Sequence, residues 1–192
     1  MDIYLIRHTN VKLDNDVCYG QSDVDIADSF EHELKELKKK LPFSPQMVFY
    51  SSPLKRCTLL SEKLSTTTPI IDKRLLEMDF GEWELKKWNL INRVKFQEWT
   101  KDFINKPCPN GESFLDLYRR SCRFFEDIIE KGHKKVGIIT HSGVIRSILS
   151  YLLKIPLKSS FKLQIGYGKV SKINLNQSKD YSLIINIEYV NK

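Results

Sequence analysis

The sequence predicts an α/β fold, a three-layer sandwich in which helices cover both faces of a mostly parallel central sheet. Two observations predict it. Short apolar runs rich in β-branched residues, such as residues 2–7, alternate along the chain with segments whose apolar residues recur at helical spacing. The 192 residues are 41% hydrophobic and 29% charged, so we expect residues 1–192 to form a single soluble domain.

The first half of the chain carries clear start and stop signals. Residues 2–7 form the first strand, and residues 8–27 are irregular. Residues 28–41 are predicted to be a helix capped by Asp28 or Ser29, which two prolines then end. The next predicted elements are a strand at 47–50, a helix at 53–65 with a serine cap and a proline at its first position, and a strand at 69–73.

The second half begins with an aromatic segment. Tryptophans and phenylalanines at irregular spacing predict short helices packed as a small flap at about 82–110. Ser113 or Asn110 then starts a long helix that runs to about residue 131. The remaining predicted elements are a strand at 134–141, a helix at 142–154, and strands at 161–165, 169–176 and 181–190.

Composition argues against several classes of protein. The net charge is +7, but lysines cluster at helical spacing, as in residues 35–40, which favours a solvated helix face over a nucleic-acid partner. No apolar run approaches the ~20 residues that span a membrane. The four cysteines lack zinc-ligand spacing, and the first residues do not resemble a signal peptide, so we expect reduced thiols and a cytoplasmic protein.

Charged residues follow two predicted strands. Arg7 and His8 lie at the carboxyl end of the first strand, and His141 ends the strand at 134–141. Ligands of such sheets bind beyond the carboxyl ends of the strands, so these side chains should meet at one site. A guanidinium suits phosphate oxygens and an imidazole can attack phosphorus, with Arg56 as a second clamp and Glu77 as proton donor. We expect no metal and no cofactor.

Four motifs appear in a fixed order: "RHT", "SSPLKRC", "LLEMDFGEWE" and "THSGVIR". Together they resemble the histidine phosphatase superfamily, which has the phosphoglycerate mutase-like fold. The resemblance implies that His8 becomes transiently phosphorylated. It also implies that Arg7, Arg56 and His141 bind the phosphoryl oxygens. Glu77 would donate a proton to the leaving group and then accept one from the attacking water, in a metal-independent phosphomonoesterase reaction.

Three further segments, residues 17–26, 107–120 and 161–170, are similar to the α-ribazole phosphatase subgroup. This likeness implies removal of the 5′-phosphate of α-ribazole 5′-phosphate during assembly of the nucleotide loop of cobalamin. A broad-specificity or sugar-phosphate phosphatase, or a phosphoglycerate mutase, remains an alternative. Lys86, Lys87 and Arg93 keep the mutase open, because mutases need extra cations. A non-catalytic module that binds phosphate or phosphoproteins is the alternative from another class.

Several assignments stay open at this point. Tyr19 and Gln21 are candidate substrate contacts or turn-packing residues, and Ser142 is a candidate helix cap whose N–H faces phosphate. Asp79 and Glu82 are rivals of Glu77 as the acid. The partner is expected to be a small phosphate monoester. The oligomeric state is open, with a homodimer among the alternatives.

The chain departs from the family pattern in places. Thr9 stands where the family has glycine after Arg-His, and Leu85 replaces the glycine of "WEG". The asparagine that many members place after the first motif has no clear match, since residues 13–15 occupy that region. The tryptophans are expected to pack the flap, with shielding of a benzimidazole-type group as the alternative; they are Trp83, Trp88 and Trp99.

Overall fold

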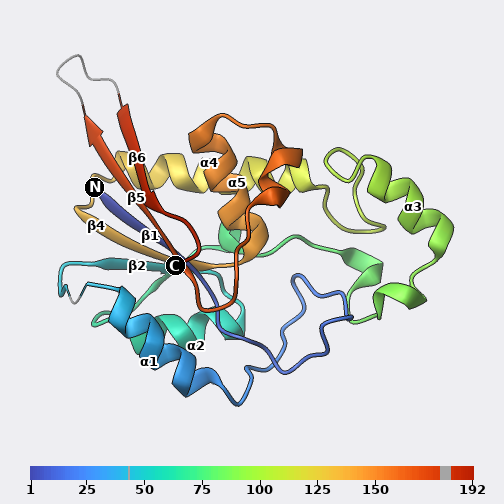
Figure 1. Cartoon of the computed structure of the whole chain (residues 1–192), viewed down its shortest axis with the longest axis horizontal. Coiled ribbons are helices and arrows are strands. Elements are labelled where there is room, and N and C mark those ends of the chain that lie inside the picture. The colour runs from blue at the N-terminus through green and yellow to red at the C-terminus, as the bar shows by residue number, and fades with distance from the viewer. Residues whose placement is uncertain (43, 178–182) are drawn as a thin grey trace.

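The central sheet has six strands in the order β3-β2-β4-β1-β5-β6 (Figure 1). The structure is a computed structural model that describes residues 1–42, 44–177 and 183–192. The parallel strands are β1 (Asp2–Arg7), β2 (Val48–Ser51), β3 (Ile70–Ile71) and β4 (Lys135–Thr140). The antiparallel strands β5 (Val170–Gln177) and β6 (Leu183–Tyr189) complete one edge.

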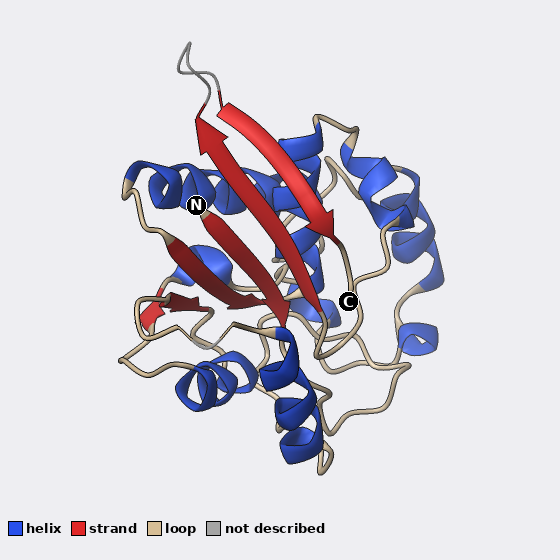
Figure 2. Ribbon diagram, turned by 60° about the vertical axis from the view of Figure 1, so that its left-hand side comes forward, coloured by secondary structure: helices blue, strands red, loops and turns tan. Residues whose placement is uncertain are grey.

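Helices cover both faces of this sheet (Figure 2). One face carries α1 (Phe30–Lys40) and α2 (Lys55–Leu64), and the other carries α4 (Phe114–Glu130) and α5 (Ser142–Leu153). Alternate residues of β1 serve the two layers: Ile3 and Leu5 pack toward α4 and α5, whereas Tyr4 and Ile6 pack toward α1 and α2. The predicted three-layer α/β sandwich is confirmed.

The predicted helical flap is present. It consists of two 3₁₀ turns, Gly81–Trp83 and Trp88–Leu90, followed by α3 (Arg93–Lys101). Trp83 contacts Trp99 edge to face, with ring centroids 5.3 Å apart, so tryptophan packing holds the flap together. Leu85 adopts a φ of 62°, the left-handed conformation that glycine usually supplies, and its N–H donates to the Cys18 carbonyl.

Three sequence predictions about local structure are wrong. Residues 161–165 form no strand, because the 3₁₀ helix η4 (Leu157–Lys162) carries Phe161 onto Phe103 and Phe114 instead. The expected serine cap of α2 is absent: Leu54 is the N-cap, no side chain caps the helix, and it begins at Lys55, close to the expected start at about residue 53. Ser142 does not cap α5: His141 occupies the N-cap and Ser142 is the first helical residue.

Other boundaries moved by one or two residues. Helix α1 begins at Phe30, with Ser29 at its N-cap but without a capping hydrogen bond from that side chain. Of the two candidate caps for α4, Ser113 is the N-cap, in a reciprocal capping box with Asp116. Residues 181 and 182 of the expected last strand lie outside the described residues. Within the described ranges, no helix has the length and apolar character needed to cross a membrane.

The capping box of α4 generates a stability prediction. Ser113→Ala should lower the free energy of unfolding by about 1 kcal/mol, because it leaves the backbone N–H of Asp116 without the Ser113 hydroxyl as acceptor. Urea unfolding measures the change. Ser29→Ala at the N-cap of α1 is the matched control and should change stability by less than about 0.5 kcal/mol. Equal effects of the two substitutions would contradict the assignment.

Candidate active site

The site forms where two neighbouring strands end. β1 and β4 pair in parallel with Arg7 opposite Thr140, and the His8 N–H donates to the Thr140 carbonyl at 3.0 Å. The next residue of each chain segment is a histidine. The ring centroids of His8 and His141 are 5.1 Å apart, so two imidazoles that are remote in sequence lie side by side.

A cavity of about 210 Å³ opens over these two rings. Its lining includes Arg7, Arg56 and Glu77, so the structure brings the five predicted catalytic residues together. Tyr19 and Ser142 also line it. Gln21 is placed differently: its side chain donates to the Glu77 carbonyl at 3.1 Å and supports that backbone from outside the cavity lining.

His8 is oriented by its own backbone. Nδ1 lies 2.7 Å from the Thr9 carbonyl oxygen, which can only accept, so Nδ1 carries the hydrogen of the neutral ring and Nε2 keeps its lone pair. Burial lowers the pKa of His8 well below its ordinary value, and the nearby Arg56 and Arg7 lower it further. The ring is therefore neutral at pH 7, with its lone pair on Nε2.

His141 is fully buried beside it. Its Nε2 lies 2.9 Å from the hydroxyl oxygen of Ser52, another fully buried residue. Burial lowers the pKa of His141 well below its ordinary value, and Arg56 and His8 add to the effect. The motif "SSPLKRC" predicts only a serine helix cap, and nothing in the sequence indicates the contact of Ser52 with His141.

The guanidinium groups of Arg7 and Arg56 are held by hydrogen bonds to backbone carbonyls. Arg56 is fully buried and donates through its Nη atoms to the carbonyls of Gly20 and Ser22. Arg7 donates to the Ile165 carbonyl and stacks on Tyr167, with Cζ 3.6 Å from the ring centroid. In the part of the chain that the structure describes, neither guanidinium forms a salt bridge. Both positive charges are therefore uncompensated by protein carboxylates.

Three buried nitrogens of the cavity residues have no hydrogen-bond partner among the described residues. They are Nε of Arg7, Nε of Arg56 and Nδ1 of His141. Buried polar atoms in folded proteins nearly always have partners, so three of them on residues that line one cavity indicate a ligand site. Donors on two cations and one imidazole suit an oxyanion with several oxygens.

The side chain of Glu77 lies against the first turn of α5. Its Oε2 accepts hydrogen bonds from the Gly143 N–H at 3.1 Å and from the Ser142 hydroxyl at 3.3 Å. A Cβ on residue 143 would lie 2.3 Å from Oε1 of Glu77, so only glycine admits the carboxylate there. The rivals face elsewhere: Asp79 accepts from the Gly81 N–H, and Glu82 accepts from the Asn110 amide.

Although Trp88 was an alternative candidate for shielding a ring of the substrate, most of the outer wall of the cavity was not predicted. Asn15, Val17, Phe80, Trp88 and Tyr167 line it, and the ring of Phe80 meets that of Trp88 edge to face at 5.7 Å. The Tyr167 hydroxyl lies 2.6 Å from that of Tyr19. Tyr167 lies within the segment 161–170 that resembled the α-ribazole phosphatases, and the only available signal for it was this likeness.

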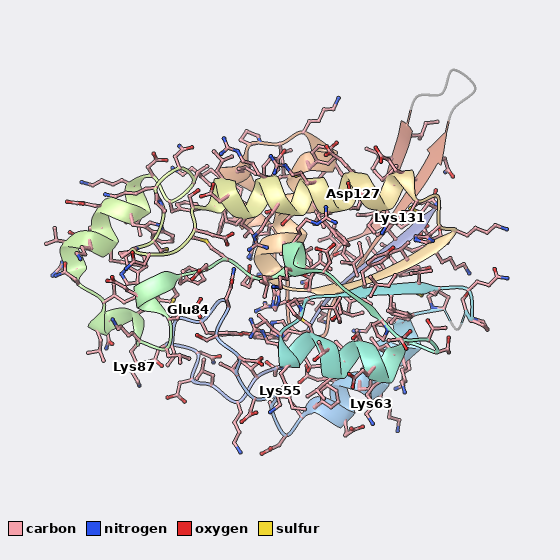
Figure 3. All side chains as sticks on the ribbon, turned by 180° about the vertical axis from the view of Figure 1, so that it is seen from behind. Lys55, Lys63, Glu84, Lys87, Asp127 and Lys131 are labelled. Atoms are coloured by element: carbon pink, nitrogen blue, oxygen red, sulfur yellow. The ribbon has the colours of Figure 1, made fainter. Side chains whose placement is uncertain are left out.

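Glu84, labelled in Figure 3, connects the flap to the loop at residues 20–22. Its carboxylate accepts from the N–H groups of Gln21, Ser22 and Phe80. Since Arg56 holds the carbonyls on the other side of the same loop, residues 20–22 are bound from both sides. Within the described residues, no group of three or more histidine, cysteine, aspartate or glutamate side chains is arranged to hold a metal ion.

Comparison with known proteins places this geometry in context. Residues 3–188 match the family model described as "Histidine phosphatase superfamily (branch 1)". "Phosphoserine phosphatase 1" of Hydrogenobacter thermophilus is 24% identical, covering 96% of this chain and 92% of that protein. "Adenosylcobalamin/alpha-ribazole phosphatase" of Salmonella typhimurium is 24% identical, covering 91% of each chain. The crystal structure of the alpha-ribazole phosphatase from Shigella flexneri shares the fold, with a TM-score of 0.85, 22% identity, and coverage of 100% of this chain and 96% of that one.

The two lowered histidine pKa values generate a prediction about pH. The unfolded chain takes up a proton at each histidine below a pH of about 6.5, whereas the folded chain keeps His8 and His141 neutral. Stability is therefore full above that pH and falls as the pH drops toward 5. The slope should reach up to about 1.4 kcal/mol per pH unit for each histidine. Urea unfolding in phosphate-free buffer measures it.

A variant pair tests whether this slope comes from the site. His8→Gln should reduce the slope between pH 6.5 and pH 5, because one of the two groups is gone. His32→Gln, a substitution of an exposed histidine on α1, should leave it unchanged. Stability that stays constant from pH 7 to pH 5 in the unsubstituted protein would contradict the burial of both rings as neutral groups.

Proposed function

The chain belongs to the histidine phosphatase superfamily (branch 1) and is a phosphatase, and from that premise we propose that it hydrolyses small phosphate monoesters through a phosphohistidine at His8. The observation that carries the proposal is the set of three unpartnered buried nitrogens on Arg7, Arg56 and His141. A phosphoryl dianion supplies the oxygens that these donors lack, and its charge matches two guanidiniums without a carboxylate partner.

In the first step, the lone pair on Nε2 of His8 attacks phosphorus and the bond from phosphorus to the ester oxygen breaks. Arg7 and Arg56 hold the non-bridging oxygens. With the Ser52 hydroxyl donating to Nε2 of His141, Nδ1 of that ring carries a hydrogen and donates to a third oxygen. Glu77 gives its proton to the leaving oxygen, and the alcohol departs.

In the second step, a water molecule attacks the phosphorus of the phosphohistidine. The Glu77 carboxylate takes a proton from this water, the bond from phosphorus to Nε2 breaks, and inorganic phosphate is released. The cycle restores the neutral ring of His8 and the protonated acid, so no other reactant is needed. The Thr9 carbonyl keeps the hydrogen on Nδ1 throughout and therefore keeps Nε2 as the reacting atom.

We assign α-ribazole 5′-phosphate as the substrate, with a role in assembly of the nucleotide loop of cobalamin. Two observations support this choice. Phe80 and Trp88 give the leaving-group side of the cavity an aromatic wall that suits a benzimidazole ring. In addition, a relative that is 24% identical is named as an adenosylcobalamin/alpha-ribazole phosphatase.

Phosphoserine is the second candidate, because other relatives of similar identity are named as phosphoserine phosphatases. A phosphoglycerate mutase ranks lower. Phosphoserine and phosphoglycerate each carry a carboxylate beside the phosphate, which calls for a further cation. Among the described residues that line the cavity, the only lysine or arginine side chains are Arg7 and Arg56, which are assigned to the phosphate. Lys87, which the sequence left as a candidate, pairs with Asp16 at 3.2 Å on the outside of the flap.

The covalent step has a direct test. His8→Ala should abolish turnover of p-nitrophenyl phosphate and remove the acid-labile, base-stable phosphoenzyme, because no other nucleophile occupies that position. Rapid quench with ³²P-labelled substrate measures the phosphoenzyme. His32→Ala, on the exposed side of α1, is the control and should retain both. Labelling that persists in His8→Ala would sink the assignment.

Substrate choice is tested by a competition between leaving groups. We expect kcat/KM for α-ribazole 5′-phosphate to exceed that for phosphoserine and for 3-phosphoglycerate by about 10-fold or more, since ring stacking is worth about 1–3 kcal/mol. Trp88→Ala should lower kcat/KM for α-ribazole 5′-phosphate by about 10-fold and for ribose 5-phosphate by less than about 3-fold. A preference for phosphoserine that Trp88→Ala does not alter would favour the second candidate.

A further inference from the structure

Arg120 on α4 uses every N–H of its guanidinium. Nη1 donates to the carbonyls of Arg74 and Leu76, and Nη2 donates to the carbonyl of Glu77 at 2.7 Å. The remaining donors, Nε and Nη2, bind both oxygens of Glu112 at 2.8 Å. A guanidinium has five such donors, so Arg120 is fully committed to these partners.

Glu112 extends the same connection past Glu77. Its Oε2 accepts from the Asp79 N–H at 3.0 Å, and its backbone N–H donates to the Asp79 carbonyl at 2.8 Å. The pair of Glu112 and Arg120 therefore holds the backbone before Glu77, at Glu77 and after it. Both side chains are mostly buried, with 22% and 18% of their surface exposed.

The backbone around Glu77 has little regular structure of its own. The 3₁₀ turn Lys73–Leu75 ends before it, and the turn Gly81–Trp83 begins after it. Helix α4, by contrast, is 17 residues long and packs against α5 through a continuous apolar face. Arg120 thus ties the irregular segment around Glu77 to the rigid helix α4. The Glu77 carboxylate is bound by the Gly143 N–H of α5, the helix that packs against α4.

We propose that the ion pair of Glu112 and Arg120 is the positioning device for Glu77 as general acid, an inference that rests on the proposed function. Neither residue lines the cavity, so both act through Glu77 and not on the substrate. Loosening their grip moves the acid away from the leaving oxygen while Arg7, Arg56 and His8 keep their places. A displacement of about 1 Å is enough to cost about 10² in rate at such a group.

This arrangement predicts a loss that depends on the leaving group. Arg120→Lys keeps the charge but loses the fork, and Glu112→Gln keeps the size but loses the paired acceptors. Each variant should lower kcat/KM for β-glycerophosphate, an alkyl ester that needs the proton, by about 10- to 100-fold. Each should lower it for p-nitrophenyl phosphate, whose leaving group barely needs a proton, by less than about 3-fold.

Three controls make the result interpretable. Arg119→Lys, one residue away and on the exposed side of α4, should leave both substrates within about 2-fold of the unsubstituted protein. Circular dichroism and urea unfolding establish that each variant folds. Glu77→Gln supplies the reference ratio between the two esters, and in the Glu77→Gln background Arg120→Lys should cause no further selective loss.

Each outcome distinguishes the two levels of the proposal. Equal losses on both esters in folded Arg120→Lys and Glu112→Gln, or no loss, would overturn the positioning role while Glu77→Gln still discriminates between the esters. A Glu77→Gln variant that slows both esters equally would overturn Glu77 as acid, and the positioning role with it. A wild-type protein that hydrolyses neither ester would overturn the proposed function itself.

Discussion

The parallel pairing of β1 with β4 is the constraint on which the rest of the structure depends. Its register sets Arg7 against Thr140, so the residues that follow each strand, His8 and His141, meet at the same edge of the sheet. That pairing requires a first strand buried on both faces, which the uninterrupted apolar run Ile3–Ile6 supplies. A slip of one residue would turn the core side chains of β1 to the wrong layers and separate the two imidazoles.

Burial of this much cationic chemistry is unfavourable for the free protein. Arg56 is completely enclosed without an ion pair among the described residues, and it is stabilised by carbonyl dipoles instead of a carboxylate. Burial disfavours a charge on His8 and His141 as well, and both rings stay neutral, as their lowered pKa values indicate. Under the proposed function, the phosphoryl group of the substrate supplies the negative charge that these groups lack, and it does so most strongly in the transition state.

The sequence predicted the layers and the strand ends, because apolar periodicity and strand-end chemistry are local properties. It also named five residues that line one cavity, Arg7, His8, Arg56, Glu77 and His141, whose catalytic roles stay a prediction. It failed where tertiary partners decide. Phe161 packs against Phe103 instead of joining the sheet, and the Ser52 hydroxyl contacts Nε2 of His141 instead of capping α2. Tyr167 was indicated only by the likeness of residues 161–170, and Trp88 only as an alternative, because tertiary contacts decide which of these side chains reach the cavity. The single-domain organisation stays a prediction.

Glu84 immediately precedes the flap segment that runs from Leu85 to the end of α3. Its carboxylate fastens the base of the flap to the loop at residues 20–22, which Arg56 grips from the opposite side. Of the residues from Leu85 to the end of α3, Trp88 lines the cavity, and the five candidate catalytic residues all lie outside this segment. Under the proposed function, sequence changes in this outer segment would alter which alcohol the enzyme accepts without changing the residues that bind phosphate.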